Sequence, residues 1–246
     1  MNDAKTFVVS FGKPNTLGDY PVYTYKDKIL ARSTCKRDLG IHINSDLSSA
    51  EHVTKCTKKA RYAAIQIKRT FKYLNIETLR QLILTFVRPH LEFCNSIWSP
   101  ILQRDKDKLE KVQRFATSSL PSLGSSSYVD RLKKLQILSV ADRMKRGDLI
   151  ETYKILNGYY DIDKSKFFTI SKSERNGTTL HVNSVHKTKE RQHFFTQRVI
   201  SVWNSLPKEV KHNTKSKHGT DSVNDFKNRL DKHFGWDVRK KKYTKK

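Results

Sequence analysis

Apolar residues recur with helical spacing through most of the chain from residue 49 onward. In the first such segment they are Val53, Cys56, Ala60, Ala63, Ile67 and Phe71. Side chains three or four residues apart lie on one face of a helix, so this segment predicts a single amphipathic helix over residues 49–73. Ser48 and Glu51 have the spacing of a capping box, which predicts where that helix begins.

The same spacing predicts further helices along the chain. The buried face of the next helix, which begins near Ile76, would consist of Leu79, Leu82, Ile83, Phe86 and Val87. Pro89 should end or kink this helix, and helix should resume over residues 91–98. Further helices are predicted over residues 105–119, 127–135, 140–156, 194–205 and 223–234. Trp98 and Trp203 lie within apolar patterns and are expected to anchor the core.

Strand-like patterns are confined to the first 45 residues. Strands are predicted over residues 5–11, 22–25, 28–31 and 39–43, which together predict a small antiparallel sheet. Residues 121–127 are rich in serine and should form a linker, and residues 161–189 are polar and poor in strands. The predicted fold class is therefore mainly α, with a small N-terminal antiparallel β region.

The charge of the chain points to an anionic partner. Lysine and arginine total 49 against 24 aspartates and glutamates, which gives a net charge of +25. Such an excess attracts nucleic acid through phosphate contacts and counterion release. An anionic membrane surface, or merely a solvated basic surface, is the alternative. The outer face of the 49–73 segment concentrates Lys55, Lys58, Lys59, Arg61, Lys68, Arg69 and Lys72, and Tyr62 beside Arg61 could add base stacking.

Cysteine usage and hydropathy favour an intracellular protein. Cys35, Cys56 and Cys94 are odd in number and widely spaced, which indicates reduced thiols. Residues 1–10 lack the apolar core of a signal peptide, and no stretch approaches about 20 apolar residues, so no membrane span is expected. The location would be the nucleus or the cytoplasm, and the basic tail at 239–246 could serve nuclear import or simply solubility.

No pattern in the chain predicts catalysis. His90 and Cys94 could form half of a zinc site, but no second pair is evident, so packing of Cys94 in the core is favoured. Asp142, Asp148 and Glu151 lie on one predicted helix among basic residues, which favours ion pairs within that helix over a nuclease-like carboxylate group. Neither a phosphate-binding loop nor a nucleophilic-serine motif is present.

Several blocks of sequence occur in an order that resembles one protein family. The N-terminal blocks are NDAKTFVVS at residues 2–10 and KRDLGI at 36–41. The central blocks are VRPHLEF at 87–93, WSP at 98–100, DKLEKVQRFAT at 107–117, LKKL at 132–135 and RGDL at 146–149. The last blocks are FFTQRV at 194–199, VWNSLP at 202–207 and DFKNRLD at 225–231. The ordered set resembles the C-terminal part of reverse transcriptases of non-LTR (LINE-type) retrotransposons of the jockey or chicken-repeat type.

The resemblance implies a division of the chain and a role for it. Residues 1–47 would be a palm remnant with a primer-grip-like hairpin, 48–120 a helical thumb, 121–238 a helical C-terminal region and 239–246 a basic tail. Such a fragment would grip the RNA template–primer duplex, RNA–DNA or DNA, and Lys5 corresponds to a lysine that can lie near nucleotide phosphates.

The resemblance also implies what this chain lacks. Polymerases of this family hold two divalent metal ions on an aromatic-x-Asp-Asp hairpin, and no Asp-Asp pair occurs in the sequence. The chain alone is therefore expected to be neither an enzyme nor a cofactor-binding protein, and Mg²⁺ is expected only for the complete polymerase. The alternative is a co-opted basic helical module that binds protein partners or an anionic membrane surface.

Overall fold

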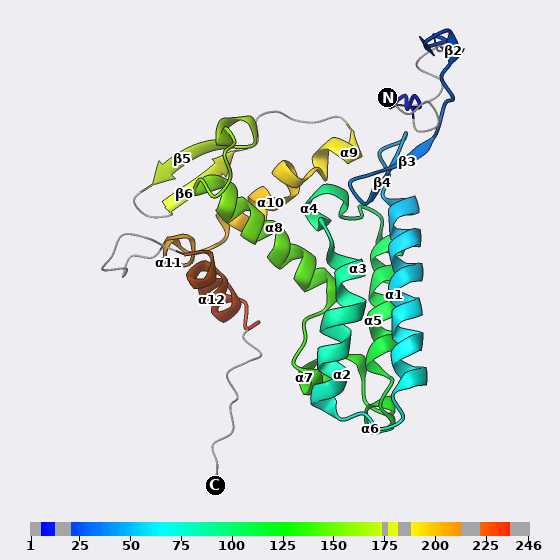
Figure 1. Cartoon of the computed structure of the whole chain (residues 1–246). Helices are drawn as coiled ribbons and strands as arrows, with labels where there is room; N and C mark the ends of the chain where they lie inside the picture. The colour runs from blue at the N-terminus through cyan, green and yellow to red at the C-terminus, as the bar shows by residue number, and fades with distance from the viewer. Residues whose placement is uncertain (1–5, 13–20, 174–176, 182–187, 213–221, 237–246) are drawn as a thin grey trace.

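The computed structural model describes residues 6–12, 21–173, 177–181, 188–212 and 222–236. Within these ranges the protein is mainly helical (Figure 1). It also contains three two-stranded antiparallel sheets. The mainly α class is therefore confirmed. The strands are β1 (Thr24–Tyr25), β2 (Lys28–Ile29), β3 (Cys35–Asp38), β4 (Ile41–Asn44), β5 (Thr169–Ser173) and β6 (Gly177–His181).

The helices and helical turns occupy most of the remaining described sequence. They are α1 (Ala50–Thr70), α2 (Ile76–Leu82), the π-helical η3 (Ile83–Val87), α3 (Arg88–Glu92), α4 (Asn95–Trp98), α5 (Gln103–Thr117), α6 (Pro121–Gly124), α7 (Tyr128–Leu135), α8 (Val140–Leu156), the 3-10 turn η4 (Lys164–Lys166), α9 (Lys189–Gln192), α10 (Phe195–Asn204), α11 (Lys208–Lys211) and α12 (Val223–His233).

The N-terminal strands form two separate hairpins instead of the single sheet that the sequence predicts. β1 pairs with β2 and β3 with β4, while the predicted strand over residues 5–11 contributes, in its described part, an isolated bridge between Val8 and Arg32. The two-residue turn between β3 and β4 has positive φ at both Leu39 and Gly40, as a twisted hairpin requires. Ile29 of the first hairpin remains 74% exposed, so this hairpin adds little to the core.

The first hydrophobic core lies between α1, α2, η3, α3, α5 and the start of α8. α1 contributes Val53, Ala60 and Ala64 to it, each almost fully buried. The predicted capping box is absent, because Ser49 is the N-cap and no side chain caps the helix there. The Ser48 hydroxyl instead accepts a hydrogen bond from the Asn44 amide.

A π-helical turn explains why one predicted core residue is exposed. Leu79, Ile83 and Val87 are buried as predicted, but Phe86 is 54% exposed. The π-helical segment η3 adds a residue to the turn and rotates the subsequent residues relative to α-helical spacing. Pro89, at the start of α3, has no amide proton for an α-helical hydrogen bond, and the wider turn accommodates it.

The predicted helix over residues 91–98 is broken in its middle. α3 ends at Glu92, and Cys94 adopts a left-handed conformation with φ of 51° before α4 begins. Cys94 is exposed, so its predicted packing in the core is wrong. Trp98 is buried as predicted, and its indole N–H donates to the Phe93 carbonyl over 2.6 Å.

The second core contains a hairpin that the sequence pattern does not predict. β5 and β6 pair over five residues within a stretch predicted to be poor in strands. α10 covers this hairpin: the Trp203 indole donates to the Thr178 carbonyl, and the Asn204 side chain bonds both the N–H and the carbonyl of Leu180. These contacts are long-range, so the local pattern of residues 161–189 does not reveal them. The predicted linker at 121–127 likewise contains a helical turn, α6, which buries Leu123.

Helix α8 belongs to both cores and runs between them in Figure 1. Its polar residues bond to other elements more than to each other, contrary to the predicted ion pairs within the helix. Asp148 pairs with Arg198 of α10, and Arg146 pairs with Asp231 of α12. Glu151 does pair within the helix, with Lys154.

Candidate nucleic-acid interface

Helix α1 carries most of the predicted basic residues on its outer side. All seven predicted residues between 55 and 72 are exposed, whereas Lys5 lies outside the described residues. Helical spacing divides the six on α1 into an outermost group and a flank, whereas Lys72 follows the end of the helix at Thr70. We define the α1 ridge as Lys55, Lys58, Lys59, Tyr62 and Arg69, which share the face turned away from the core.

The flanking residues turn toward α5 and do not join the ridge. The Arg61 guanidinium lies 4.5 Å from the centre of the Phe115 ring, and the Lys68 ammonium 5.9 Å from it. Arg61 is thus partnered with Phe115 of α5. Tyr62 itself is 65% exposed among the ridge cations, which leaves its ring accessible.

A basic pocket of about 490 Å³ opens beside the ridge, between α1, α3 and the β3–β4 hairpin. We call it the basic pocket; its lining residues are Arg37, Leu39, Gly40, His42, His52, Lys55, Cys56, Lys59, Pro89, His90 and Phe93. None of these lining residues carries a carboxylate. Lys55 and Lys59 belong to both the ridge and the pocket, so the two features are continuous. The Lys55 ammonium also lies 3.3 Å from Glu51 in the preceding turn.

Three histidines line the pocket, and the structure favours the neutral form of two of them, His42 and His52. Burial, with His42 and Lys59 nearby, lowers the pKa of His52 to about 4. Burial, followed by the nearby Lys55, also lowers the pKa of His42. The His42 backbone N–H donates to His52 Nδ1, so the proton of His52 resides on Nε2. The His52 ring packs 4.5 Å from the Trp98 ring, which fixes its orientation.

Phe93 forms an aromatic wall of the pocket and is 53% exposed. Its backbone is held on both sides, because its N–H donates to Pro89 and its carbonyl accepts from Trp98. The hairpin turn lies close to its ring, because a β-carbon placed on Gly40 would be 3.2 Å from a ring carbon. With φ of 93°, this position favours glycine for its conformation as well.

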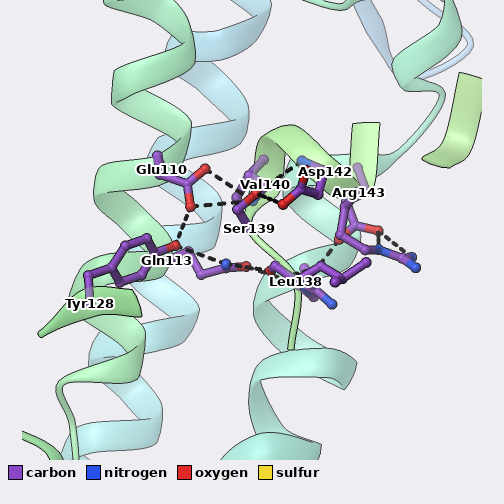
Figure 2. Close-up of polar contacts among 10 residues, drawn as sticks. Glu110, Gln113, Tyr128, Leu138, Ser139, Val140, Asp142 and Arg143 are labelled. Carbon is purple, nitrogen blue, oxygen red and sulfur yellow. Dashed lines mark hydrogen bonds and ion pairs between the residues drawn. The ribbon is translucent and has the colours of Figure 1, made fainter. Parts of the chain in front are cut away.

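A buried polar network fixes α3, and with it one wall of the pocket, relative to α5 and α8. Figure 2 shows its α5 and α8 side: Glu110 accepts from the Val140 N–H and the Tyr128 hydroxyl, and Gln113 donates to the Leu138 carbonyl. Beside these groups, Arg143 of α8 donates to Glu92 of α3 over 2.7 Å.

Arg88 of α3 completes this network from a buried position. Its guanidinium donates to Gln113 and to the Leu138 carbonyl, and it lies 3.2 Å from Glu92. Burial lowers the pKa of Arg88 to about 10, so the side chain remains charged at neutral pH. Every contact of this network is structural, and none faces the basic pocket.

The pocket residues outside α1 escaped prediction because three separate elements bring them together. Arg37 and His42 lie opposite each other across the β3–β4 ladder, and His90 comes from α3. The basic residues on both sides of the Leu39–Gly40 turn could have indicated a binding site, but their proximity to α1 depends on tertiary packing.

Other candidate chemistry finds no support among the described residues. They contain no group of three histidine, cysteine or acidic side chains placed to hold a metal ion, and His90 and Cys94 gain no further ligand. No helix in the described ranges is long and apolar enough to cross a membrane.

Residues from the family-like blocks are found inside the second core and at the junction of the two cores. Phe195 and Trp203 are buried, and Arg198 and Asp148 bond to each other. Their roles in this structure are thus in packing and pairing. No protein-family model, curated protein or solved structure was found to match the chain.

Proposed function

We propose that this chain binds nucleic acid through the α1 ridge. The observation that supports this proposal most is the continuity of the ridge with the carboxylate-free basic pocket. From Lys55 to Arg69 the ridge extends about 20 Å along the helix axis, enough to follow several phosphates of one strand. Contacts of this kind fix position on the backbone and read shape more than sequence.

We further propose that the setting is a reverse transcriptase of the non-LTR retrotransposon type. Support comes from the ordered sequence blocks and from a hairpin, β3–β4, that packs beside a long basic helix as a primer-grip hairpin and thumb would. In that setting residues 1–47 are a palm remnant and 48–120 a thumb that holds the template–primer duplex, in the nucleus or cytoplasm. Without an Asp-Asp pair the chain holds the substrate and leaves nucleotide transfer to residues outside it.

Salt-dependent binding tests the proposal directly. A fluorescein-labelled blunt RNA–DNA hybrid should bind the wild-type chain with an affinity that falls linearly on a log–log plot against salt concentration. The double variant Lys58→Ala/Arg69→Ala removes two ridge cations outside the pocket. It should weaken binding by roughly ten-fold or more at low salt and reduce the slope by about two, measured by fluorescence anisotropy.

A charge-matched control separates the ridge from general basicity. Lys133→Ala/Lys134→Ala removes two exposed lysines from α7, remote from the ridge, and should leave the slope nearly unchanged. Equal losses in the two double variants would show that net charge alone drives binding.

A second function class has one observation in its favour. A cavity of about 720 Å³ between α5, α7, α8 and α10 is lined by apolar side chains such as Leu132, Val140 and Val199, together with charged ones that include Asp142 and Arg198. A co-opted module that binds a protein could use it. Absence of measurable hybrid binding at low salt would favour this alternative over the ridge.

A further inference from the structure

We propose that the basic pocket takes one unpaired nucleotide, with the base against Phe93 and the phosphate at Arg37, Lys55 and Lys59. This proposal rests on the proposed nucleic-acid binding and adds a preference for a strand end or overhang over a blunt duplex. The proposal is supported by the shape and lining of the pocket, because the ridge alone would bind the phosphate backbones of blunt and overhanging hybrids equally well.

The volume of the pocket indicates more than a phosphate site. About 490 Å³ is within the range of small-molecule sites and far larger than the space one phosphate group needs. A paired base inside a duplex cannot enter such a recess, because its faces are covered by its neighbours in the stack. A single unpaired base can enter, and its phosphate then remains at the rim.

The lining matches the two halves of a nucleotide. Cations stand on two elements, Arg37 on β3 and Lys55 and Lys59 on α1, and all three are exposed where a backbone phosphate would pass. The apolar side is supplied by Leu39, Pro89 and Phe93. A nucleobase needs such an apolar or aromatic face, and stacking on an aromatic side chain tolerates any base.

The aromatic wall is preorganised. Phe93 has both backbone groups hydrogen-bonded, and Gly40 of the hairpin turn closes on the edge of its ring. The backbone under the ring is therefore fixed, which lowers the conformational entropy that stacking of a base on the ring would cost. The neutral imidazoles of His42 and His52 add polar ring nitrogens to the lining without adding charge.

The experiment compares three labelled hybrids: blunt, with an overhang of a few nucleotides, and with the same overhang made abasic. Wild-type protein should prefer the ordinary overhang over the abasic one by roughly five-fold or more. Phe93→Ala should abolish that preference while binding to the blunt hybrid persists. Phe86→Ala is the matched control, because Phe86 is exposed to almost the same extent, lies in the helical run that ends just before Phe93, and is outside the pocket.

A second measurement does not depend on a substitution. Wild-type protein is photo-crosslinked to an overhang that carries 4-thiouridine, and the attachment site is mapped by peptide mass spectrometry. Attachment to the segment that contains Phe93 or to the β3–β4 turn supports the pocket, and attachment only to α7 or to the second core overturns it.

The two proposals fail in different ways. Equal affinity for ordinary and abasic overhangs, or a preference that survives Phe93→Ala, overturns the pocket while the ridge stands. A preserved overhang preference combined with no effect of Lys58→Ala/Arg69→Ala overturns the ridge while the pocket stands. Absence of binding to all three hybrids overturns both.

Discussion

At the scale of single residues, His52 shows how a polar group becomes part of a core. It is 5% exposed, accepts a hydrogen bond from His42, and packs against Trp98. Its surroundings contain Lys59 and His42 and, among the residues lining the pocket, no carboxylate that would stabilise an imidazolium. The folded chain therefore holds this side chain in its neutral form.

This arrangement predicts that acid destabilises the fold through His52. The pKa of His52 is lowered to about 4, so between about pH 6.5 and pH 4 the unfolded chain binds a proton that the folded chain does not. The contribution is fully present above pH 6.5 and is lost progressively as pH falls through this window. Urea unfolding followed at several pH values should show the decline, with a steepest slope on the order of 1 kcal/mol per pH unit.

His52→Asn isolates this effect, because its side-chain oxygen can keep the hydrogen bond from His42 but cannot titrate. The variant should be less stable at pH 7, by about 1 kcal/mol from lost ring packing, yet should show a flatter pH dependence. An unchanged slope in His52→Asn would assign the acid sensitivity to other groups.

At the scale of elements, close packing of α4 against α8 depends on a helical glycine. A β-carbon at Gly147 would lie 2.7 Å from Asn95 Oδ1. The Asn95 side chain cannot easily give way, because its amide donates to the Met144 carbonyl and to Asp148. Glycine normally weakens a helix by about 1 kcal/mol relative to alanine, so its place in α8 is explained by this contact.

Gly147→Ala should therefore destabilise the protein despite its better helix propensity. The expected loss is about 1–3 kcal/mol in the free energy of unfolding, measured by urea denaturation. Gly124→Ala is the matched control, because a β-carbon at Gly124 in α6 meets nothing within 4 Å. That control should be neutral or slightly stabilising, and the same result for Gly147→Ala would mean that α4 can move away without cost.

Long periodic elements were predictable from the sequence because their apolar spacing is a local property. α1, α5, α8, α10 and α12 lie within a few residues of their predicted bounds. The β5–β6 hairpin was not predictable, because Trp203 and Asn204, twenty or more residues away, hold it in place. The exposure of Phe86 was missed for a different reason: a π-helical turn changes the spacing on which the prediction depends.

The candidate site was likewise predictable in part. The basic residues of α1 were visible as a periodic run, and the structure confirms that they are exposed. Their separation into a ridge and a flank required the position of Phe115 on α5, which only tertiary packing supplies. The basic pocket depends on contact among three elements, so its histidines and Phe93 carried no local signal of a common site.

At the scale of the whole molecule, Arg198 of α10 joins the two cores. It donates two hydrogen bonds to Asp148 of α8 and further bonds to the carbonyls of Asn95 and Ser96 in α4. Asp148 is buried, and burial raises its pKa even though Arg198 opposes the rise. Because burial opposes ionisation of Asp148, we expect the pair to contribute more to the alignment of the cores than to net stability.

Removal of one partner alone should then lower the free energy of unfolding by more than half of the loss caused by removing both. Asp148→Asn and Arg198→Met should each lower the free energy of unfolding by about 3 kcal/mol, because each leaves a buried polar or charged group unpaired. The double variant should be destabilised by clearly less than the sum of the two, in a double-mutant cycle measured by urea denaturation.

Glu151→Ala supplies the control on the same helix, because its pair with Lys154 is about one-third exposed and should contribute less than about 1 kcal/mol. Additive losses at Asp148 and Arg198 would show that the two residues act independently. A double variant that is less destabilised than the sum of the single variants would show that the two residues act as one unit. Because Arg198 also holds the α4 segment that comes after Phe93, Arg198→Met should then weaken the overhang preference of the basic pocket without touching the α1 ridge.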